Sequence, residues 1–490
     1  MIPDGDALDA GLAIDGPESR APAVGAAPLF TARSFEKTWL EGGVDWCEAA
    51  LADLASTAPE SPLLQACRAL YHYRRSEFAL SLAWWERFLG QGQLQGEYFE
   101  DVFDCCSHLG CTETARRLAA TMAAPAPARW KSTIEIDMRL AMGLDDEIAL
   151  AAPDAPFDAP IAVWEHHQQA LSQMRREGVA ASLEAYERAW ASPAARQMFA
   201  APDDPESYDL FWGADEPPPE QLWVHPRFGL GDGIQWLRYL PALATVGVNV
   251  VVTDARLQGL VLKGQGEIDA PVSRSKLEAL GPVQLGERRW TDGYALMTRL
   301  FPHLGYAPAA KGFLRANSAP RACSLLEESR VRSGGRRRLA LVWSANESLR
   351  FAQKSLTVDQ VLPLLALGDI HWVVAQRGYQ RAAFLELGLG HRATVLPEDL
   401  SLAETGAVLE GLDGVVTCDT SIAHLAGAMG LPTAMFLSAA ADGRWESAAH
   451  TTPWYPSMRL HRQARLGDWS GMVANLAEAL ARGETGASRP

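Results

Sequence analysis

Residues 414–430 read GVVTCDTSIAHLAGAMG, and this stretch decides the fold of the second half of the chain. Its first five residues are mostly apolar or β-branched and predict a buried strand. The small residues that follow predict a helix that packs closely against a sheet. Asp419 or Thr420 caps this helix, and the free backbone N–H groups behind the cap favour an anion such as a diphosphate. His424, four residues after Thr420, projects from the same face.

Strand signals of the same kind recur on both sides of this stretch and alternate with helical signals. Residues 222–225 and 248–253 flank a glycine-rich loop and a helix at residues 234–246, which together form a βαβ unit. Further strands are predicted at residues 338–343, 371–375 and 432–437. This alternation predicts two doubly wound domains with parallel sheets, in which ligands bind beyond the carboxyl ends of the strands.

Residues 29–200 carry helical periodicity, with apolar residues three and four apart at 76–89 and 161–190. No 34-residue period persists. We therefore expect degenerate helical pairs that resemble tetratricopeptide repeats, with an unrelated helical domain as the alternative. A stacked-helix surface of this kind usually binds protein. Residues 1–28 are expected to be a disordered lead-in, and residues 201–221 a stiff, proline-rich linker.

The composition of the 490 residues is typical of a globular protein. No apolar run approaches the about 18 residues that a membrane-spanning helix needs, and the N-terminus lacks the features of a signal peptide, so we expect a cytoplasmic protein. Residues 1–220 carry 36 acidic and 16 basic side chains, whereas residues 221–490 carry 24 and 28. The acidic first half argues against a nucleic-acid partner, and the slightly basic second half suits an anionic small molecule.

The pattern continues with Asp442-Gly443-Arg444-Trp445 and then with WYPSMRL at residues 454–460. Together with residues 419–432, these segments resemble the C-terminal domain of bacterial glycosyltransferases of family 9. These enzymes are related to the ADP-heptose:lipopolysaccharide heptosyltransferases and are often fused to tetratricopeptide repeats. The resemblance covers roughly residues 222–480. It implies an α/β GT-B fold of two facing Rossmann-like domains, an acceptor-side domain at residues 222–335 and a nucleotide-sugar-binding domain at residues 336–490.

The first block of the resemblance is the glycine-rich loop of the βαβ unit. Gly229 and Gly231 either form a tight turn or let a sugar approach the backbone. Asp232 is either the helix N-cap or, as the resemblance implies, the catalytic base that takes the proton from an acceptor hydroxyl. Gln235 and Arg238 either hold the acceptor or the sugar, or are surface residues.

The second block, residues 341–356, begins at the end of the strand at residues 338–343 and continues into the loop that follows it. Ser344 and Asn346 are expected to donate hydrogen bonds to phosphate or sugar. Lys354 stands where the relatives carry arginine. Its charge would neutralise the leaving diphosphate, unless it is only a solvated lysine of a flexible loop.

The third block is the strand–helix junction at residues 414–430. The resemblance implies that Thr420, Ser421 and the amides behind them hold the phosphates of the nucleotide sugar, while Asp419 orders the loop. His424 is, with the aspartate of the first block, a candidate catalytic residue that donates to the diphosphate or the sugar. The alternative is a structural histidine on an apolar helix.

Two further nucleotide-sugar contacts are expected outside these stretches. Gln376 ends the strand at residues 371–375, a position that lies near the base or ribose in relatives. Arg444 follows Gly443, where relatives usually carry an aromatic residue, so the packing of the sugar would differ here.

We expect no metal and no cofactor beyond the donor substrate. No Asp-x-Asp motif follows a strand as a metal clamp would require. The cysteine cluster at residues 105–111 lacks the companions of a tetrahedral zinc site. The seven cysteines fit a reducing compartment instead.

Taken together, the residues and the resemblance favour a glycosyltransferase that moves a sugar from a nucleotide-diphosphate sugar to a hydroxyl acceptor by an inverting, single displacement. The acceptor would be a protein, such as flagellin, or a surface-polysaccharide precursor, docked by the helical region. One alternative is a catalytically degenerate scaffold whose helical half binds protein. Two replacements favour it: Ala345 stands where the relatives carry glycine, and Gly443 stands where they usually carry an aromatic residue. The other is a nucleotide-sugar epimerase, which would need no docking surface.

Overall fold

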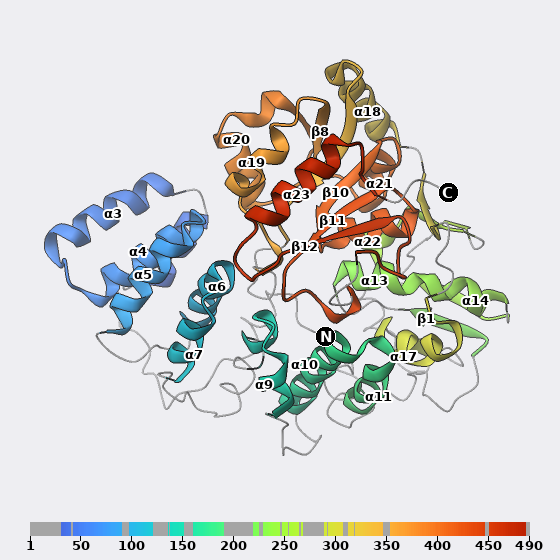
Figure 1. The fold of residues 1–490 in the computed structure, drawn as a ribbon, viewed down its shortest axis with the longest axis horizontal. Coiled ribbons are helices and arrows are strands. Elements are labelled where there is room, and N and C mark those ends of the chain that lie inside the picture. The colour runs from blue at the N-terminus through green and yellow to red at the C-terminus, as the bar shows by residue number, and fades with distance from the viewer. Residues whose placement is uncertain are drawn as a thin grey trace, which may run out of the picture. The chain divides into compact units, whose positions relative to one another are not determined.

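A computed structural model gives the fold of the chain (Figure 1). The predicted lead-in, most of the predicted linker and Asn346 lie outside the residues that it describes. The described residues are 31–40, 43–90, 98–120, 136, 138–150, 160–190, 219–224, 229–245, 247–252, 254–263, 266–267, 289–291, 293–306, 312–317, 319–345, 353–445 and 450–486.

Contacts divide the described chain into two compact units. The first, which we term the helical unit, consists of the described residues up to Met138 together with Gln353. The second, which we term the sheet unit, consists of the described residues from Arg139 to Ala345 and from Lys354 onward.

The helical unit is built from helices that pack against their neighbours in sequence (blue in Figure 1). Ser61 caps the helix α4 by accepting a hydrogen bond from the Leu64 N–H at 3.2 Å, and Gly110 ends α6 in the left-handed conformation. The helix predicted at residues 76–89 is confirmed as α5. The elements are α2 (Ala32–Leu40), α3 (Val44–Thr57), α4 (Pro62–Arg74), α5 (Phe78–Leu89), α6 (Phe99–Leu109) and α7 (Thr112–Ala120). The tetratricopeptide-like character of this stack stays a prediction.

Among the described residues of the first half, the helices α9 (Asp145–Leu150), α10 (Pro160–Glu177) and α11 (Val179–Trp190) belong to the sheet unit. The helical stretch predicted at residues 161–190 is therefore two helices, which break at Gly178 with a φ of +90°. Helix α10 packs against α9 and α11, and α11 packs against α17 (Gly293–Leu304). The helices expected as one domain at residues 29–200 are thus shared between the two units.

A small parallel sheet of order β2-β1-β5 confirms the predicted βαβ unit. Its strands are β1 (Gln221–Val224), β2 (Asn249–Val252) and β5 (Arg289–Thr291). The helix between β1 and β2 begins earlier than predicted and is broken into α13 (Leu230–Trp236), η3 (Leu237–Tyr239) and α14 (Leu240–Thr245). The sequence pattern does not predict a second, antiparallel sheet of order β4-β3-β6; its strands are β3 (Leu260–Leu262), β4 (Gly266–Glu267) and β6 (Leu314–Ala316).

A six-stranded parallel sheet of order β9-β8-β7-β10-β11-β12 forms the centre of the C-terminal part. The first strand in sequence, β7, lies in the middle, and the order reverses between β7 and β10. This is the order of doubly wound nucleotide-binding sheets, whose ligands bind where the order reverses. The strands are β7 (Arg337–Val342), β8 (Ile370–Val374), β9 (Ala393–Val395), β10 (Gly414–Cys418), β11 (Thr433–Leu437) and β12 (Met458–Arg462).

Helices cover both faces of this sheet, which explains why its strands are almost continuously apolar. One face packs against α19 (Val358–Leu365) and α23 (Ser470–Ala481) through a core that includes Leu364, Trp469 and Leu476. The other face packs against α18 (Pro320–Ser333), α21 (Leu402–Glu410) and α22 (Ser421–Met429). Because α13 also packs against α22, the apolar core continues from the six-stranded sheet into the smaller parallel sheet.

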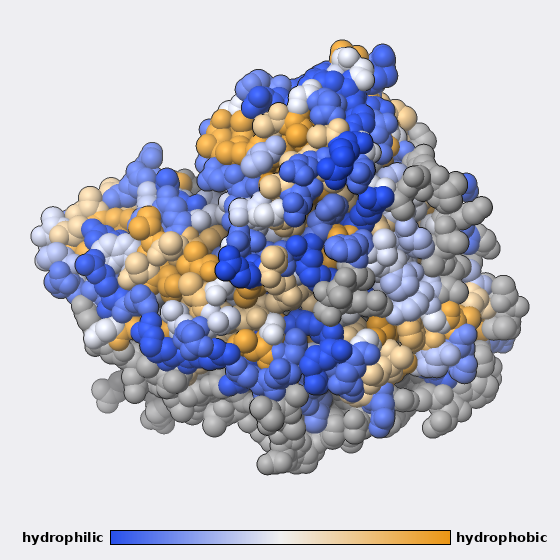
Figure 2. All heavy atoms as spheres, viewed as in Figure 1, coloured by the Kyte–Doolittle hydropathy of each residue, from blue (hydrophilic) through white to orange (hydrophobic). Residues whose placement is uncertain are grey.

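The described residues on the face drawn in Figure 2 are mainly hydrophilic, with a few apolar patches. One patch lies over α19 and α20 (Tyr379–Glu386), where Leu362, Leu385 and Leu387 are exposed. No helix among the described residues is long and apolar enough to cross a membrane.

Candidate functional site

The loop after β7 returns to the point where the strand order reverses. The Leu356 N–H donates to the Trp343 carbonyl at 2.9 Å, and the Ala345 N–H donates to the Ser355 hydroxyl at 3.0 Å. These bonds bring Lys354 back to the end of β10, where its Nζ lies 3.1 Å from Oδ2 of Asp419. The predicted cation is therefore not a solvated loop lysine, because it forms an ion pair at the expected ligand position.

Gln376 orders this loop. Its Oε1 accepts from the Trp343 and Ser344 N–H groups at 3.0 and 2.9 Å, and its Nε2 donates to the carbonyls of Ser344 and Arg377. An amide side chain has two acceptor positions and two donors, so these four bonds use all of them. We therefore interpret Gln376 as a residue that holds the loop rather than one that contacts the nucleotide base directly.

Helix α22 begins as the sequence predicts, directly after β10. Thr420 is the N-cap, with an extended backbone (φ −136°, ψ 175°), and its side chain makes no capping bond to the helix. Its hydroxyl lies 3.4 Å from that of Thr417. The first amides of the helix, beginning at Ser421, are therefore not capped by the Thr420 side chain. Such an N-terminus favours a negatively charged group.

His424 is buried in the first turns of α22, where its two ring nitrogens face different groups. Nδ1 lies 2.9 Å from the Tyr455 hydroxyl, and Nε2 lies 3.8 Å from Oδ1 of Asp419. The ring also packs against Trp445, with centroids 5.3 Å apart. Burial, helped by the charge of Arg444, lowers the pKa of His424 to about 3, so the imidazole is neutral near pH 7.

Asp232 lies in the first turn of α13 and is joined to the C-terminal part by Arg444. The Arg444 Nη1 donates to Asp232 Oδ1 at 2.6 Å and to Gln235 Oε1 at 2.7 Å, while Nη2 donates to Asp442 at 3.1 Å. The N-cap of α13 is Gly229, so the interpretation of Asp232 as the N-cap is wrong. Its carboxylate instead lies beside the turn η7 (Gly443–Trp445).

A close approach of two helices explains Gly231. A Cβ atom at this position would lie 2.5 Å from Cδ2 of His424, so only glycine lets α13 come this near to α22. A Cβ atom at Gly229 would lie 3.1 Å from Oδ2 of Asp232. Gly231 therefore serves the contact between α13 and α22, whereas Gly229 leaves room for the carboxylate of Asp232.

Opposite charges keep the carboxylates of Asp419 and Asp442 ionised. Burial raises the pKa of Asp419, but neighbouring groups, above all Lys354, outweigh burial and hold this pKa below its ordinary value. Burial acts in the same direction on Asp442, and the charge of Arg444 outweighs it and holds the pKa of Asp442 well below its ordinary value. Burial opposes the charge of Lys354, yet Asp419 and Asp442 raise its pKa. We call the set Asp232, Lys354, Asp419, His424, Asp442 and Arg444 the charged cluster.

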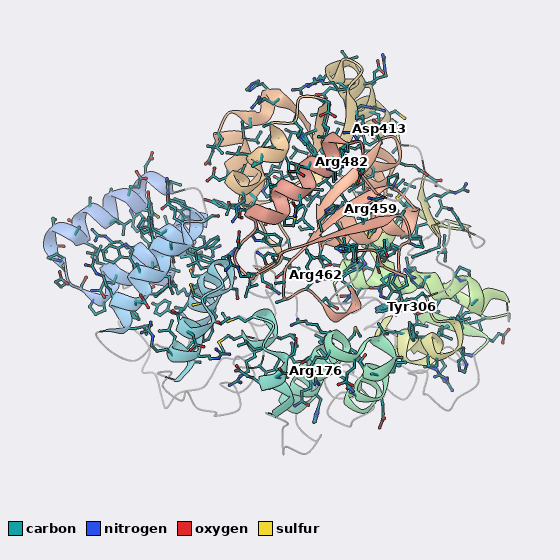
Figure 3. All side chains as sticks on the ribbon, in the orientation of Figure 1. Arg176, Tyr306, Asp413, Arg459, Arg462 and Arg482 are labelled. Atoms are coloured by element: carbon teal, nitrogen blue, oxygen red, sulfur yellow. The ribbon has the colours of Figure 1, made fainter. Side chains whose placement is uncertain are left out.

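Arg238 and Gln235 are both buried, so the interpretation of them as surface residues is wrong. Arg238 donates to the carbonyls of Gln235, Tyr306 and Trp454 at 2.9, 3.1 and 2.9 Å (Tyr306 is labelled in Figure 3). Its guanidinium also lies 4.8 Å from the Trp454 ring centroid. These contacts give Arg238 a structural role, because they join η3 to Tyr306, just after α17, and to Trp454.

Gly443 accommodates helix α10. A Cβ atom at this position would lie 2.3 Å from the backbone nitrogen of Arg175. The Arg175 guanidinium is held by the Leu140 carbonyl and by Asp145, at 3.1 and 3.2 Å. The other side of η7 is held by Arg462, which donates to the Trp445 carbonyl at 3.1 Å (Figure 3). Glycine stands at position 443, where the relatives usually carry an aromatic residue, because the backbone of α10 occupies the space that a side chain would need.

The structure brings most of the predicted site residues together. Lys354, Asp419, Thr420, Ser421 and His424 meet where the strand order reverses, and Arg444 connects them to Asp232. Ser344 lies in the loop after β7, where its hydroxyl donates to the Ala345 carbonyl at 3.2 Å. Sequence reasoning missed the roles of Asp442 and Tyr455. The spacing of Asp442 two residues before Arg444, which allows a local turn bond, was an available signal.

One family model matches the part of the chain that contains most of the charged cluster. Residues 372–460 match the model of glycosyltransferase family 9 (heptosyltransferase). The match runs from β8 to β12 and includes Asp419, His424 and Arg444, and it supports a glycosyl transfer function. Protein FlbA of Caulobacter vibrioides is 23% identical over 368 residues, which are 71% of this chain and 59% of that protein. The chain therefore spans less than two thirds of the length of this relative.

Two solved structures are also similar. The glycosyl transferase family 9 protein from Veillonella parvula DSM 2008 is 12% identical, with 54% of this chain and 95% of that chain covered at a TM-score of 0.38. A mutant O-GlcNAc transferase from Thermobaculum terrenum is 13% identical, with 92% of each chain covered at a TM-score of 0.30. Both TM-scores are below 0.5.

Among the described residues, no group of three or more His, Cys, Asp or Glu side chains is placed to hold a metal ion. The cysteines of the described residues form no disulfide bonds, and most of them are buried.

Proposed function

We propose that the protein is a glycosyltransferase that moves a sugar from a nucleotide-diphosphate sugar to a hydroxyl acceptor. The observation that carries this proposal is the ion pair of Lys354 and Asp419, which lies where the strand order reverses and beside the uncapped start of α22. A cation and free helix amides at this position suit a diphosphate. The family match over residues 372–460 supports the same function.

In this proposal the diphosphate of the donor lies at the start of α22. The amides that begin at Ser421 and the hydroxyl of Thr420 hold its oxygens, and His424 donates a hydrogen bond to it. Lys354 turns from Asp419 toward the phosphates and neutralises the charge that develops as the diphosphate leaves. Helix N-terminus and lysine together supply this charge, so the reaction needs no metal ion.

Asp232 acts as the general base. It takes the proton of the acceptor hydroxyl as that oxygen forms a bond to the anomeric carbon, while the bond from that carbon to the diphosphate breaks. The diphosphate leaves with the bonding electron pair. A single displacement of this kind inverts the anomeric centre. Arg444 orients Asp232 through the bond of 2.6 Å and is shared with Asp442.

The acceptor is a protein, such as flagellin, or a surface-polysaccharide precursor, and the helical unit docks it. The stacked helices of this unit support a docking role, because such stacks present extended surfaces to protein partners. We also propose that the protein is cytoplasmic. It binds no nucleic acid in this proposal, because the first 220 residues carry 36 acidic against 16 basic side chains.

One observation favours a second function, a catalytically degenerate scaffold whose helical half binds protein. The carboxylates of Asp232 and Asp419 are both engaged by cations of the charged cluster, which stabilises the site without a ligand. A scaffold would keep these ion pairs for folding alone and would bind no nucleotide.

Nucleotide binding separates the two functions. We would measure the thermal shift of the full chain with UDP, ADP and GDP, and with CMP as a control, on the wild type and on His424→Ala. A thermal shift with one nucleoside diphosphate that becomes smaller in His424→Ala supports the transferase and identifies the nucleobase of the donor. Hydrolysis of the matching nucleotide sugar would be measured next. No shift with any diphosphate would overturn the transferase and leave the scaffold.

A further inference from the structure

The neutral ring of His424 has two positions for its single proton, and its surroundings differ at the two nitrogens. Nε2 faces Oδ1 of Asp419 at 3.8 Å, and an ionised carboxylate only accepts hydrogen bonds. Nδ1 faces the hydroxyl of Tyr455 at 2.9 Å, and a hydroxyl both donates and accepts. The carboxylate therefore favours a proton on Nε2, since a lone pair there would point at another lone pair.

Tyr455 lies on the other side of the ring, near Arg238. The guanidinium carbon of Arg238 lies 5.0 Å from the centroid of the Tyr455 ring. Burial raises the pKa of Tyr455 to about 12, although the charge of Arg238 opposes this rise, so the hydroxyl keeps its proton near pH 7. Because a proton on Nε2 leaves Nδ1 with a lone pair, the Tyr455 hydroxyl donates to Nδ1, its partner at hydrogen-bond distance.

We infer that Asp419 and Tyr455 hold His424 in the tautomer with its proton on Nε2, so that the ring presents an N–H donor to the donor-sugar site. Tyr455 is a positioning residue, because it acts through His424. In the proposed transferase, on which this inference rests for its use, the Nε2–H donates to the diphosphate, and His424 does not take the proton of the acceptor. That task is left to Asp232.

The charged groups that face the ring from the packed elements fit this assignment. They are Asp419 at the start of α22, Lys354 after β7, and Asp442 and Arg444 at η7. The two cations oppose a second proton on the ring, and the nearest carboxylate favours the Nε2 proton. The charge pattern therefore selects a neutral donor rather than an imidazolium.

The tautomer can be measured directly in the full chain by nitrogen NMR with ¹⁵N-labelled histidine. Signals of His424 among the 11 histidines are assigned by their loss in His424→Gln. We expect a protonated Nε2 and an unprotonated Nδ1 in the wild type, and a mixture of tautomers in Tyr455→Phe. A wild-type ring with its proton on Nδ1 would overturn the inference, whether or not the Tyr455 variant folds.

Tyr239→Phe is the matched control, because the Tyr239 hydroxyl also makes a buried bond, to the Gly305 carbonyl at 2.9 Å, but does not bond to His424. We expect Tyr455→Phe, and not Tyr239→Phe, to weaken binding of the nucleoside diphosphate about three- to tenfold, the worth of one hydrogen bond. Equal losses in the two variants would contradict the positioning role. If the tautomer is as inferred but no nucleotide binds, the proposed function fails and the tautomer assignment stands.

Discussion

At the scale of single residues, Lys354 is the group whose charge the proposed donor site needs most. Lys354→Met should weaken binding of the nucleoside diphosphate at least about tenfold, or about 1.4 kcal/mol, because it removes the cation and leaves Asp419 unbalanced. Lys354→Arg, which keeps the charge, should restore most of the affinity. Both would be measured by calorimetric titration, with the salt dependence of binding as a second readout.

Lys263→Met is a matched control for this lysine. Lys263 donates to the Gly312 carbonyl at 2.9 Å, and Gly312 packs against Met429 at the far end of α22. It therefore lies near the same helix but away from its N-terminus, and its loss should leave the affinity unchanged. Similar losses at Lys263 and Lys354 would mean that net charge, rather than a specific site, governs binding.

Asp232 should affect turnover rather than binding. In Asp232→Asn the amide oxygen can still accept from Arg444, which Gln235 and Asp442 also hold. The arrangement should therefore persist, while the group that takes the proton is lost. We expect turnover of the nucleotide sugar to fall about 10²- to 10⁴-fold with nucleotide affinity almost unchanged. Turnover close to that of the wild type would exclude Asp232 as the base.

At the scale of elements, the packing of α10 against η7 can be tested with one methyl group. Gly443→Ala would place its Cβ 2.3 Å from the Arg175 backbone nitrogen, so one of the two elements must move. We expect a loss of about 1–3 kcal/mol of stability, typical of overpacking, and weaker nucleotide binding because Arg444 is displaced. The melting temperature and the nucleotide-induced shift report the two effects.

Gly471→Ala provides the opposite expectation. Gly471 lies in the first turn of α23, and a Cβ atom there would meet nothing within 4 Å. Alanine favours a helix over glycine by about 0.5–1 kcal/mol, so this variant should be slightly more stable than the wild type. A Gly443→Ala variant that behaves like Gly471→Ala would show that α10 does not constrain η7.

The same elements show what the sequence can and cannot predict. The predicted bounds of strands β7, β8, β10 and β11 agree with the structure within about one residue, because strands buried on both faces are continuous apolar runs. The site junction at Thr420 is also predictable, since a strand followed by the start of a helix is a local pattern. The burial of Arg238 is not, because it depends on carbonyls of Tyr306 and Trp454, which are distant in sequence. Periodicity likewise shows that α10 has an apolar face but not which element covers it.

At the scale of the whole molecule, buried histidines couple folding to pH. The pKa of His424 falls from an ordinary value of 6.5 to about 3, mainly through burial, and burial also lowers the pKa of His371 to about 4. Between these values and 6.5 the unfolded chain binds more protons than the folded chain. The free energy of unfolding should therefore decrease as pH falls from about 6.5. The lowered pKa values of Asp419 and Asp442 extend this loss below about pH 4.

A comparison of two histidine variants measures the share of His424 in this pH dependence. His424→Gln removes a group that must stay neutral in the folded chain, so the melting temperature of this variant should fall less steeply between about pH 6.5 and about pH 4.5 than that of the wild type. His303→Gln, a change at an exposed position on α17, should keep the wild-type slope. Absolute stability is not the readout, because the new side chain also changes packing around Trp445 and Tyr455. Parallel pH profiles for the wild type and His424→Gln would mean that the pKa of His424 is the same in the folded and the unfolded chain. The ring would then become a cation beside Asp419 below about pH 6.5, and burial would not keep it neutral as argued above.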